Sequence, residues 1–276
     1  MKETLITQIE SALQDMRQKK PLIHHITNYV TVNDCANIVL AIGASPIMAD
    51  DIEEAEAITS ISSALVLNIG TLNRRTVESM LAAGKKANEL GIPVILDPVG
   101  AGASGLRNRT VERLIKEIKF SVLRGNMSEI RFVAGLSAAT KGVDASDADL
   151  ASDAETGRAV AETVAKKLGC VTAITGATDI VSDGSRTVYI ENGTKLLSTV
   201  TGTGCMCTSL VGSFCGGTSD YLIPAIGGVL SMGIAGEIAA EGTRDMGSGS
   251  FHIAVIDALS KLSAQTLAGR AKIHEA

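Results

Sequence analysis

Short hydrophobic runs alternate with amphipathic stretches along the first two thirds of the chain. Apolar runs of this length between turn-forming residues predict buried strands, and the intervening stretches have the period of helices. The predicted strands are 22–26, 46–49, 64–69, 93–97, 120–124 and 170–175. Because strands and helices alternate regularly, we predict an α/β fold with a mostly parallel central sheet.

The rest of the chain departs from this alternation. Residues 140–153 are polar and predict a surface connection, followed by a helix over about 155–168. The runs 179–183 and 186–190 flank an Asp-Gly-Ser turn and predict an antiparallel hairpin. From residue 205 the sequence is rich in glycine and predicts helices to the end. Since the pattern shows no repeat and no domain linker, residues 1–276 are predicted to form one domain.

Composition narrows the range of partners. The 276 residues are 45% hydrophobic, which allows a large core, and the net charge is −5. Aromatic residues make up only 3% and tryptophan is absent, so neither a basic face nor a base-stacking surface for nucleic acid is expected. The apolar runs are shorter than the roughly 18 residues of a membrane span, and the N-terminal stretch carries acids. We expect a cytoplasmic protein with no nucleic-acid or membrane partner.

The cysteines and histidines do not suggest a metal or disulfide framework. Five cysteines occur without a C-x-x-C pair, and on a helix Cys205 and Cys207 would point about 200° apart. His24 and His25 are adjacent on a predicted strand, so their side chains face opposite ways. We expect one of these histidines to be buried and hydrogen-bonded, in preference to a catalytic pair.

Polar and small residues gather where the predicted strands end. Parallel α/β sheets bind ligands outside the carboxyl ends of their strands. The residues at these ends are Met48, Asp50, Asn68, Gly70, Asp97, Arg124, Asn126, Thr175 and Gly176. The sequence therefore predicts a binding site along one rim of the sheet.

The glycine-rich segment 100–105 matches G-x-G-x-x-G after a predicted strand. Three features disfavour a nicotinamide cofactor: the mid-chain position, the Asp97-Pro98 pair, and the absence of a ribose-binding acid at the end of the next strand. A flexible loop is the alternative interpretation. The chain also lacks the G-x-x-x-x-G-K-[ST] phosphate-binding loop.

The segment T-G-T-G-C, residues 201–205, precedes a predicted helix. Consecutive backbone amides at a helix start bind anions, although a tight turn capped by threonine would have the same sequence. Asp97 and Glu129 add carboxylates to the same rim; Glu129 could also be a simple helix-dipole partner. Two carboxylates beside an anion site suit a hydrated Mg²⁺ that bridges phosphates. Together these features predict phosphoryl transfer without a P-loop.

Several segments in combination resemble the hydroxyethylthiazole kinase family of the ribokinase-like superfamily. They are H-H-I-T-N-Y-V-T-V-N-D-C-A-N, G-A-S-P-I-M-A-D, D-P-V-G-A-G-A-S, L-R-G-N-M-S-E-I, A-I-T-G-A-T-D and T-G-T-G-C-M. The resemblance runs from about Pro21 to the last predicted helix. It implies a three-layer α/β/α fold and ATP-dependent, Mg²⁺-assisted phosphorylation of the hydroxyl of 4-methyl-5-(2-hydroxyethyl)thiazole in thiamine (vitamin B1) salvage. It also implies a homotrimer with sites between subunits.

The resemblance assigns roles by position. Cys205 stands where most ribokinase-like enzymes have a catalytic aspartate, and a free thiol is a weaker base than a carboxylate at neutral pH. Gly202 and Gly204 would form the anion hole beside it. The residues that bind ATP would be Arg124, Asn126, Thr175 and Gly176. Asp97 and Glu129 would bind Mg²⁺. The residues that bind the thiazole would be Met48, Asn28, Gly70 and Gly202.

Three alternatives remain open at this stage. A hydroxymethylpyrimidine-type vitamin-precursor kinase would share the fold, although the A-D-D and T-N-Y-V-T-V-N-D segments favour thiazole by resemblance. An ATP-dependent nucleotide-hydrate dehydratase of the same superfamily would consume ATP without phosphorylating thiazole. A non-catalytic nucleotide-binding protein is the third, because the aspartate of the glycine motif is absent.

Overall fold

A computed structural model describes residues 2–135 and 147–276, in which one nine-stranded sheet runs in the order β2-β1-β3-β4-β5-β6-β7-β8-β9. Strands β1 to β6 are parallel, and β7 to β9 continue the sheet in antiparallel pairing. The strands are β1 Leu22–Ile26, β2 Ser45–Met48, β3 Ala64–Asn68, β4 Val94–Asp97, β5 Val122–Asn126, β6 Val171–Thr175, β7 Asp179–Ser182, β8 Thr187–Ile190 and β9 Ile273–Glu275. The six predicted parallel strands and the predicted hairpin are confirmed.

Two predictions along the chain were wrong. The C-terminal residues form β9 against β8, not a helix, and this strand is too short to leave a period-2 pattern in the sequence. The helix predicted from about 155 is α7, Asp147–Leu168, so residues 147–153 of the predicted surface connection are helical. The remainder of that connection, up to residue 146, lies outside the described residues.

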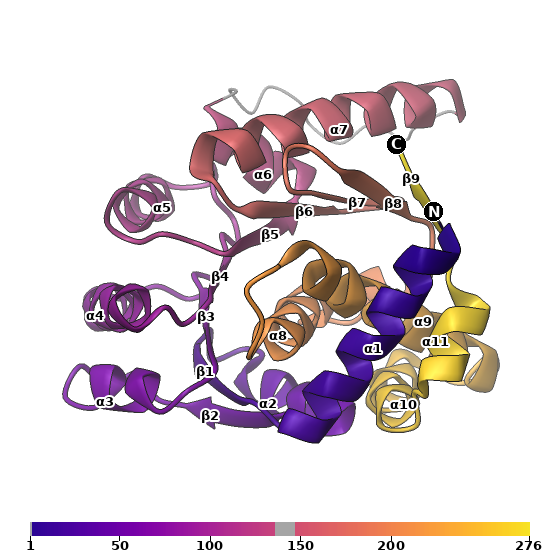
Figure 1. Ribbon diagram of the computed structural model, residues 1–276, viewed down its shortest axis with the longest axis horizontal. Coiled ribbons are helices and arrows are strands. Elements are labelled where there is room, and N and C mark those ends of the chain that lie inside the picture. Colours follow the sequence, from indigo (N-terminus) through magenta and orange to yellow (C-terminus); the bar gives the residue numbers. More distant parts are fainter. Residues whose placement is uncertain (1, 136–146) are drawn as a thin grey trace.

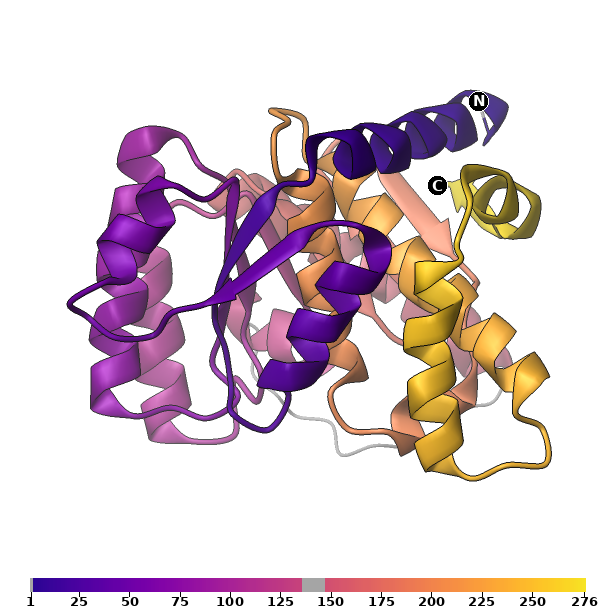
Figure 2. The same cartoon turned by 90° about the horizontal axis from the view of Figure 1, so that it is seen from below.

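Helices cover both faces of the sheet, which gives three layers (Figure 1). One layer contains α3 Ala55–Ser60, α4 Arg74–Leu90, α5 Gly105–Glu117, α6 Met127–Ala134 and α7. The other contains α1 Lys2–Lys19, α2 Val32–Ile42, α8 Thr203–Cys215, α9 Leu222–Gly242, α10 Ser248–Ser260 and α11 Ala264–Arg270, with the 3₁₀ helix η1 Lys195–Thr199 nearby. The N- and C-termini lie near each other in both views (Figures 1 and 2).

Each face of the sheet has its own hydrophobic core. All five residues of β3 are buried; Val66 packs in the core beneath α8, and Leu65 and Leu67 pack in the core beneath α4. A strand covered on both faces is apolar at every position, which explains the uninterrupted apolar runs of the sequence. The two cores together fix the strand ends that carry the polar residues.

Helix α9 is the one described helix that is long and apolar enough to cross a membrane by length and composition. In the fold, 83% of its most apolar window is buried. It packs against α8 and α10, and its residues belong to the core on that face of the sheet. Its hydrophobicity is therefore accounted for by core packing.

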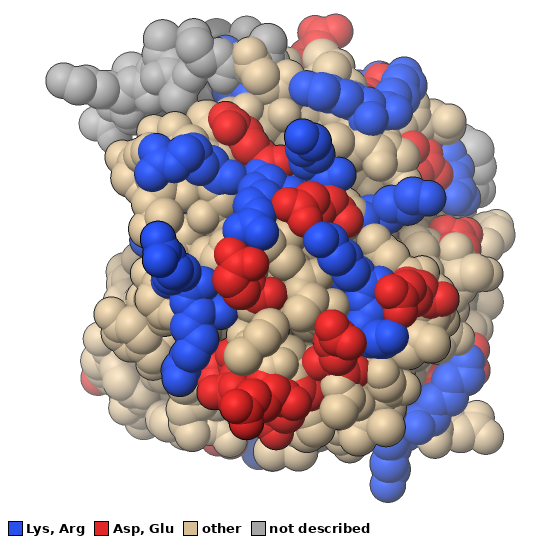
Figure 3. Space-filling model, turned by 90° about the vertical axis from the view of Figure 1, so that its left-hand side faces the viewer, with Lys and Arg blue, Asp and Glu red and all other residues tan. Residues whose placement is uncertain are grey.

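The outer face of the α3–α4–α5 layer is charged. Lys/Arg and Asp/Glu side chains alternate over it in Figure 3. Arg113 of α5 pairs with Glu78 of α4 at 2.6 Å, and Lys85 of α4 pairs with Glu117 of α5 at 2.5 Å. Exposed pairs of this kind add little stability, and mixed charges are typical of a face turned to water.

Candidate active site

The strand register brings the polar strand ends together. Asn68 at the end of β3 lies opposite Asp97 at the end of β4, and Asn126 at the end of β5 lies opposite Thr175 of β6. Neighbouring parallel strands end at the same edge, so residues far apart in sequence become adjacent. These four strand-end residues therefore lie along one edge of the sheet, as the sequence predicted.

Helix α8 starts at this rim. Its N-cap is Gly202, in the left-handed conformation with φ 88°, and no side chain caps the helix. The alternative of a turn capped by threonine is therefore wrong; Thr203 donates its hydroxyl to the Leu197 carbonyl at 2.9 Å instead. A Cβ at residue 202 would lie 2.6 Å from Cγ2 of Thr31, so glycine is required by both conformation and space. The first-turn amides stay free of a side-chain cap, as an anion site needs.

Two asparagines surround the thiol of Cys205, which is the third residue of α8. Asn28 Nδ2 lies 3.3 Å from the sulfur and Asn68 Nδ2 lies 3.2 Å from it. The two carboxamides are also joined to each other, with Asn28 Nδ2 donating to Asn68 Oδ1 at 2.9 Å. Sequence reasoning assigned Asn28 to the substrate pocket and gave Asn68 no role beyond its strand-end position.

Asp97 is completely buried beneath the thiol. Its Oδ2 accepts hydrogen bonds from Asn68 at 3.0 Å and from the Thr208 hydroxyl at 2.7 Å, and Arg124 lies 3.7 Å away. Its Oδ1 has no hydrogen-bond partner in the described part of the chain. Burial raises the pKa of Asp97 to about 6; Glu129 adds to this rise, and Arg124 opposes it. A carboxylate held in this way favours a cationic partner.

Glu129 has a structural role that the sequence partly anticipated. It forms a capping box with Asn126, whose side chain accepts from the Glu129 N–H at 2.9 Å. Its Oε2 accepts from the Asn126 N–H and its Oε1 from the Gly100 N–H, both at 2.8 Å. The glycine-rich segment after β4 is thus tied to this carboxylate. Each oxygen keeps a second lone pair for a ligand.

The thiol of Cys205 is a weak acid in this setting. Burial raises its pKa, and the nearby Asp97 charge raises it further, while the hydrogen bonds from Asn28 and Asn68 act in the opposite direction. All five cysteines are free, and Cys205 is half-buried while the other four are buried. Cys205 is therefore the most exposed of the five cysteines, while the buried Cys207 contributes to the wall of the cavity beside α8.

A cavity of about 530 Å³ opens beside the start of α8. Arg124, Thr175, Gly176 and Gly204 line it, as does Asp179, whereas Asn126 does not. The Arg124 guanidinium donates to the Thr175 hydroxyl. Burial raises the pKa of Asp179 to about 7, and the hydrogen bond from the Gly176 N–H opposes that rise. Sequence reasoning missed Asp179 because it treated this residue only as the start of a hairpin strand.

The residues predicted to bind thiazole lie around β1 and its neighbours. Met48 is half-buried at the end of β2, opposite His25 in the register. Gly70 donates its N–H to Asn68 Oδ1 at 2.8 Å, and a Cβ at residue 70 would lie 2.9 Å from the Asn28 side chain. Asn28 thus contacts the thiol directly and Gly70 lies next to both asparagines, while Gly202 lies beside Thr31 at the start of α8.

Both histidines of β1 are buried, where one was expected. His24 lies 2.9 Å from the Thr59 hydroxyl and 2.7 Å from the Ala49 carbonyl. His25 lies 3.1 Å from the Ser209 hydroxyl of α8, and burial lowers its pKa to about 4. Their opposite directions are as expected for neighbours on a strand, and each ties β1 to a different layer.

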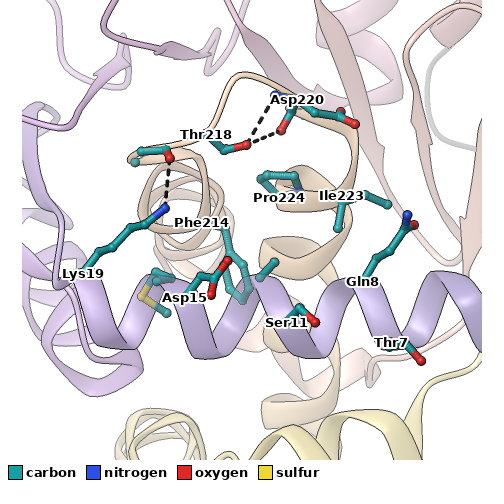
Figure 4. Close-up of a pocket in the computed structure, with 14 residues that line it drawn as sticks. Thr7, Gln8, Ser11, Asp15, Lys19, Phe214, Thr218, Asp220, Ile223 and Pro224 are labelled. Atoms are coloured by element: carbon teal, nitrogen blue, oxygen red, sulfur yellow. Dashed lines mark hydrogen bonds between the residues drawn. The ribbon is translucent and has the colours of Figure 1, made fainter.

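A second cavity, of about 330 Å³, lies between α1 and the connection from α8 to α9 (Figure 4). Phe214 at the far end of α8 contributes to its wall, and Lys19 reaches across to the Gly217 carbonyl at 3.2 Å. This cavity contains none of the rim residues described above. Of the rim residues, Arg124, Thr175, Gly176 and Gly204 line the larger cavity instead, whereas Cys205 and Asp97 are not part of its lining.

A model of the hydroxyethylthiazole kinase family matches residues 13–265. The chain belongs to this family. The hydroxyethylthiazole kinase of Clostridium beijerinckii is 63% identical over 275 residues, which is 100% of each chain. The resemblance inferred from the sequence motifs is confirmed.

Solved structures agree with this assignment. The structure of a hydroxyethylthiazole kinase protein from Pyrococcus horikoshii OT3 is 38% identical, covers 97% of this chain and 98% of its own, and has a TM-score of 0.87. A ribokinase-like superfamily protein from Enterococcus faecalis is only 11% identical, covers 90% and 89%, and has a TM-score of 0.60. The second likeness shows the fold alone. The predicted ribokinase-like α/β/α fold is confirmed.

Proposed function

We propose that this protein transfers the γ-phosphoryl group of ATP to the hydroxyl of 4-methyl-5-(2-hydroxyethyl)thiazole, in thiamine salvage. The observation that carries the proposal is the start of α8, which has no side-chain cap, lines the rim cavity through Thr203 and Gly204, and carries Cys205 beside the Asn68 amide that also binds the buried Asp97. Family membership supports the same activity. A hydroxymethylpyrimidine-type kinase or a nucleotide-hydrate dehydratase is not favoured by these relatives.

The residues present suit a phosphoryl transfer that depends on positioning. Phosphoryl transfer proceeds through a loose transition state, so fixed positive groups and aligned oxygens contribute more than a strong base. The amides of Gly202 and Gly204 and the Arg124 guanidinium would hold the transferring group. Arg124, Thr175 and Gly176, which line the cavity, would bind ATP, while Asn126 would support the site by capping α6. Cys205 would accept the proton of the thiazole hydroxyl. Its raised pKa leaves little thiolate at neutral pH, so Cys205 is a poorly populated general base, and the same scarcity of thiolate disfavours a phosphocysteine.

Asp97 and Glu129 fit a hydrated Mg²⁺. The buried Asp97 Oδ1 has no partner in the described residues, and a divalent cation would complete its coordination. Mg²⁺ is typically held by one or two carboxylates together with phosphates and water. When bound, Mg²⁺ would neutralise phosphate charge.

The test of the proposed function is direct. Purified protein is mixed with Mg-ATP and hydroxyethylthiazole, and the products are analysed by mass spectrometry. The proposal expects the thiazole phosphate ester and ADP in equal amounts, and no ester without thiazole alcohol. ATP consumption without an ester would instead favour a dehydratase, and tight ATP binding without turnover would favour a non-catalytic protein.

We further propose that the protein is a cytoplasmic homotrimer with its sites between subunits, where Met48, Asn28, Gly70 and Gly202 contact the thiazole. Large apolar side chains are exposed between β1 and α2, on α2, and on or just before α10; helices α2 and α10 pack together. They are Tyr29, Val30, Leu40, Met246 and Ile253. Exposed apolar groups of this kind favour self-association, unlike the charged face of Figure 3. Light scattering that found a fully active monomer at assay concentration would refute the trimer.

A further inference from the structure

The Asn68 carboxamide uses all of its hydrogen-bonding positions. Only 2% of this residue is exposed. Its Nδ2 donates to Asp97 Oδ2 at 3.0 Å and to Cys205 Sγ at 3.2 Å, while its Oδ1 accepts from Asn28 Nδ2 at 2.9 Å and from the Gly70 N–H at 2.8 Å. A primary amide has two N–H groups and two acceptor lone pairs, so all four positions are occupied.

These partners fix which end of the amide faces the sulfur. In the reverse orientation the oxygen would face the Asp97 carboxylate and the NH₂ group would face the Gly70 N–H, which are both repulsive contacts. Asn28 is fixed in the same manner, because its Oδ1 accepts from the Thr31 N–H and hydroxyl, both at 3.1 Å. The sulfur of Cys205 is therefore bordered by two N–H donors.

The two N–H donors affect both the orientation and the charge of the Cys205 thiol. They occupy sulfur lone pairs, so the S–H bond must point away from both amides. They also stabilise negative charge on the sulfur, because hydrogen bonds to a charged acceptor are stronger than those to a neutral one. The two hydrogen bonds therefore lower the pKa of the Cys205 thiol, whereas its burial and the nearby Asp97 carboxylate raise that pKa.

We propose that Asn68, with Asn28, is a positioning residue that stabilises and orients the Cys205 thiolate, whose remaining lone pair accepts the proton of the substrate hydroxyl. The proposal rests on the proposed function, in which Cys205 receives that proton. Asn68, which is almost fully buried, acts through the thiol and through Asp97. The strand end of β3 thereby sets the orientation of a group that is 137 residues away in sequence.

The test measures the reactivity of the Cys205 thiol. Each protein is treated with iodoacetamide between pH 6.5 and 10, and Cys205 modification is followed by peptide mass spectrometry. Asn68→Ala removes the donor. Asn68→Asp keeps the shape and the acceptor for the Gly70 N–H but cannot donate to the sulfur. Asn73→Ala is the matched control, since Asn73 caps α4 and does not contact the thiol.

Loss of one donor to the charged sulfur should lower Cys205 alkylation at pH 8 roughly tenfold and move its pH midpoint up by about one unit. Both Asn68 variants should show this shift and a lower kcat, with KM for ATP unchanged, while the control keeps the wild-type alkylation profile. A wild-type profile in either folded Asn68 variant would overturn the proposal, as would an equal shift in the control. If Cys205→Ala kept full kcat, the proposed role of the thiol would fail while the alkylation result would stand by itself.

Discussion

Replacement of Asp97 by asparagine should stabilise the ligand-free protein and inactivate it. The pKa of Asp97 is raised from 3.8 to about 6, mainly by burial. Each unit of pKa difference between folded and unfolded states corresponds to 1.36 kcal/mol, so the ionised group costs about 3 kcal/mol of folding stability at neutral pH. An asparagine avoids the charge, and its side-chain oxygen can still accept from Asn68 and Thr208.

The destabilisation caused by ionised Asp97 should depend on pH. For an acid with a raised folded pKa, the folded state holds its proton at pH values where the unfolded state has released it. The cost is absent below about pH 4, grows between pH 4 and 6, and is complete above pH 6. Asp97→Asn should therefore have the higher Tm at pH 7.5 and lose this advantage as the pH falls.

The assay is thermal unfolding of ligand-free wild type and variant from pH 4.5 to 8. About 3 kcal/mol corresponds to a Tm difference of roughly 5–10 °C in a chain of this size. Asp257→Asn, which alters an exposed acid on α10, is the control and should change little. A variant less stable than wild type at pH 7.5, or a Tm difference independent of pH, would refute this account of Asp97. Mg-ATP should stabilise the wild type more than the variant, and turnover should be lost in the variant.

Three further predictions concern the reaction itself. Cys205→Ala should lower kcat without abolishing it, because general-base assistance is typically worth 10²–10⁴-fold. Cys205→Asp should match or exceed the wild-type kcat. If the Asp variant were folded but inactive and a phosphorylated thiol could be trapped on the wild type, Cys205 would instead be a nucleophile. Glu129→Gln should reduce kcat roughly 100-fold or more at saturating Mg²⁺, and wild-type turnover there would remove Glu129 from the metal site. Met48→Ala should raise KM for the thiazole alcohol and leave KM for ATP nearly unchanged, because a thioether packs well on an aromatic ring; equal changes in both constants would indicate a general packing defect.

Several features of the site follow from local sequence. The strands β3 and β4 are apolar up to their last residue because both of their faces are covered, so their ends at Asn68 and Asp97 are visible in the sequence. Asn68, Asp97 and Thr175 could be placed on one rim because parallel strands end at the same edge. The free start of α8 was recognisable from its glycines, since Gly202 requires a left-handed backbone.

Only the tertiary structure decides the contacts among these residues and the charges they hold. Asn28, Asn68 and Cys205 come from three separate elements, and the direction of their hydrogen bonds depends on side-chain orientation, which strand and helix patterns do not encode. The raised pKa of Asp97 arises because α8 covers it and removes it from water, an effect of packing between segments 111 residues apart. The strand β9 exists because the edge of β8 offers unpaired backbone groups, and those become available only after the sheet has formed.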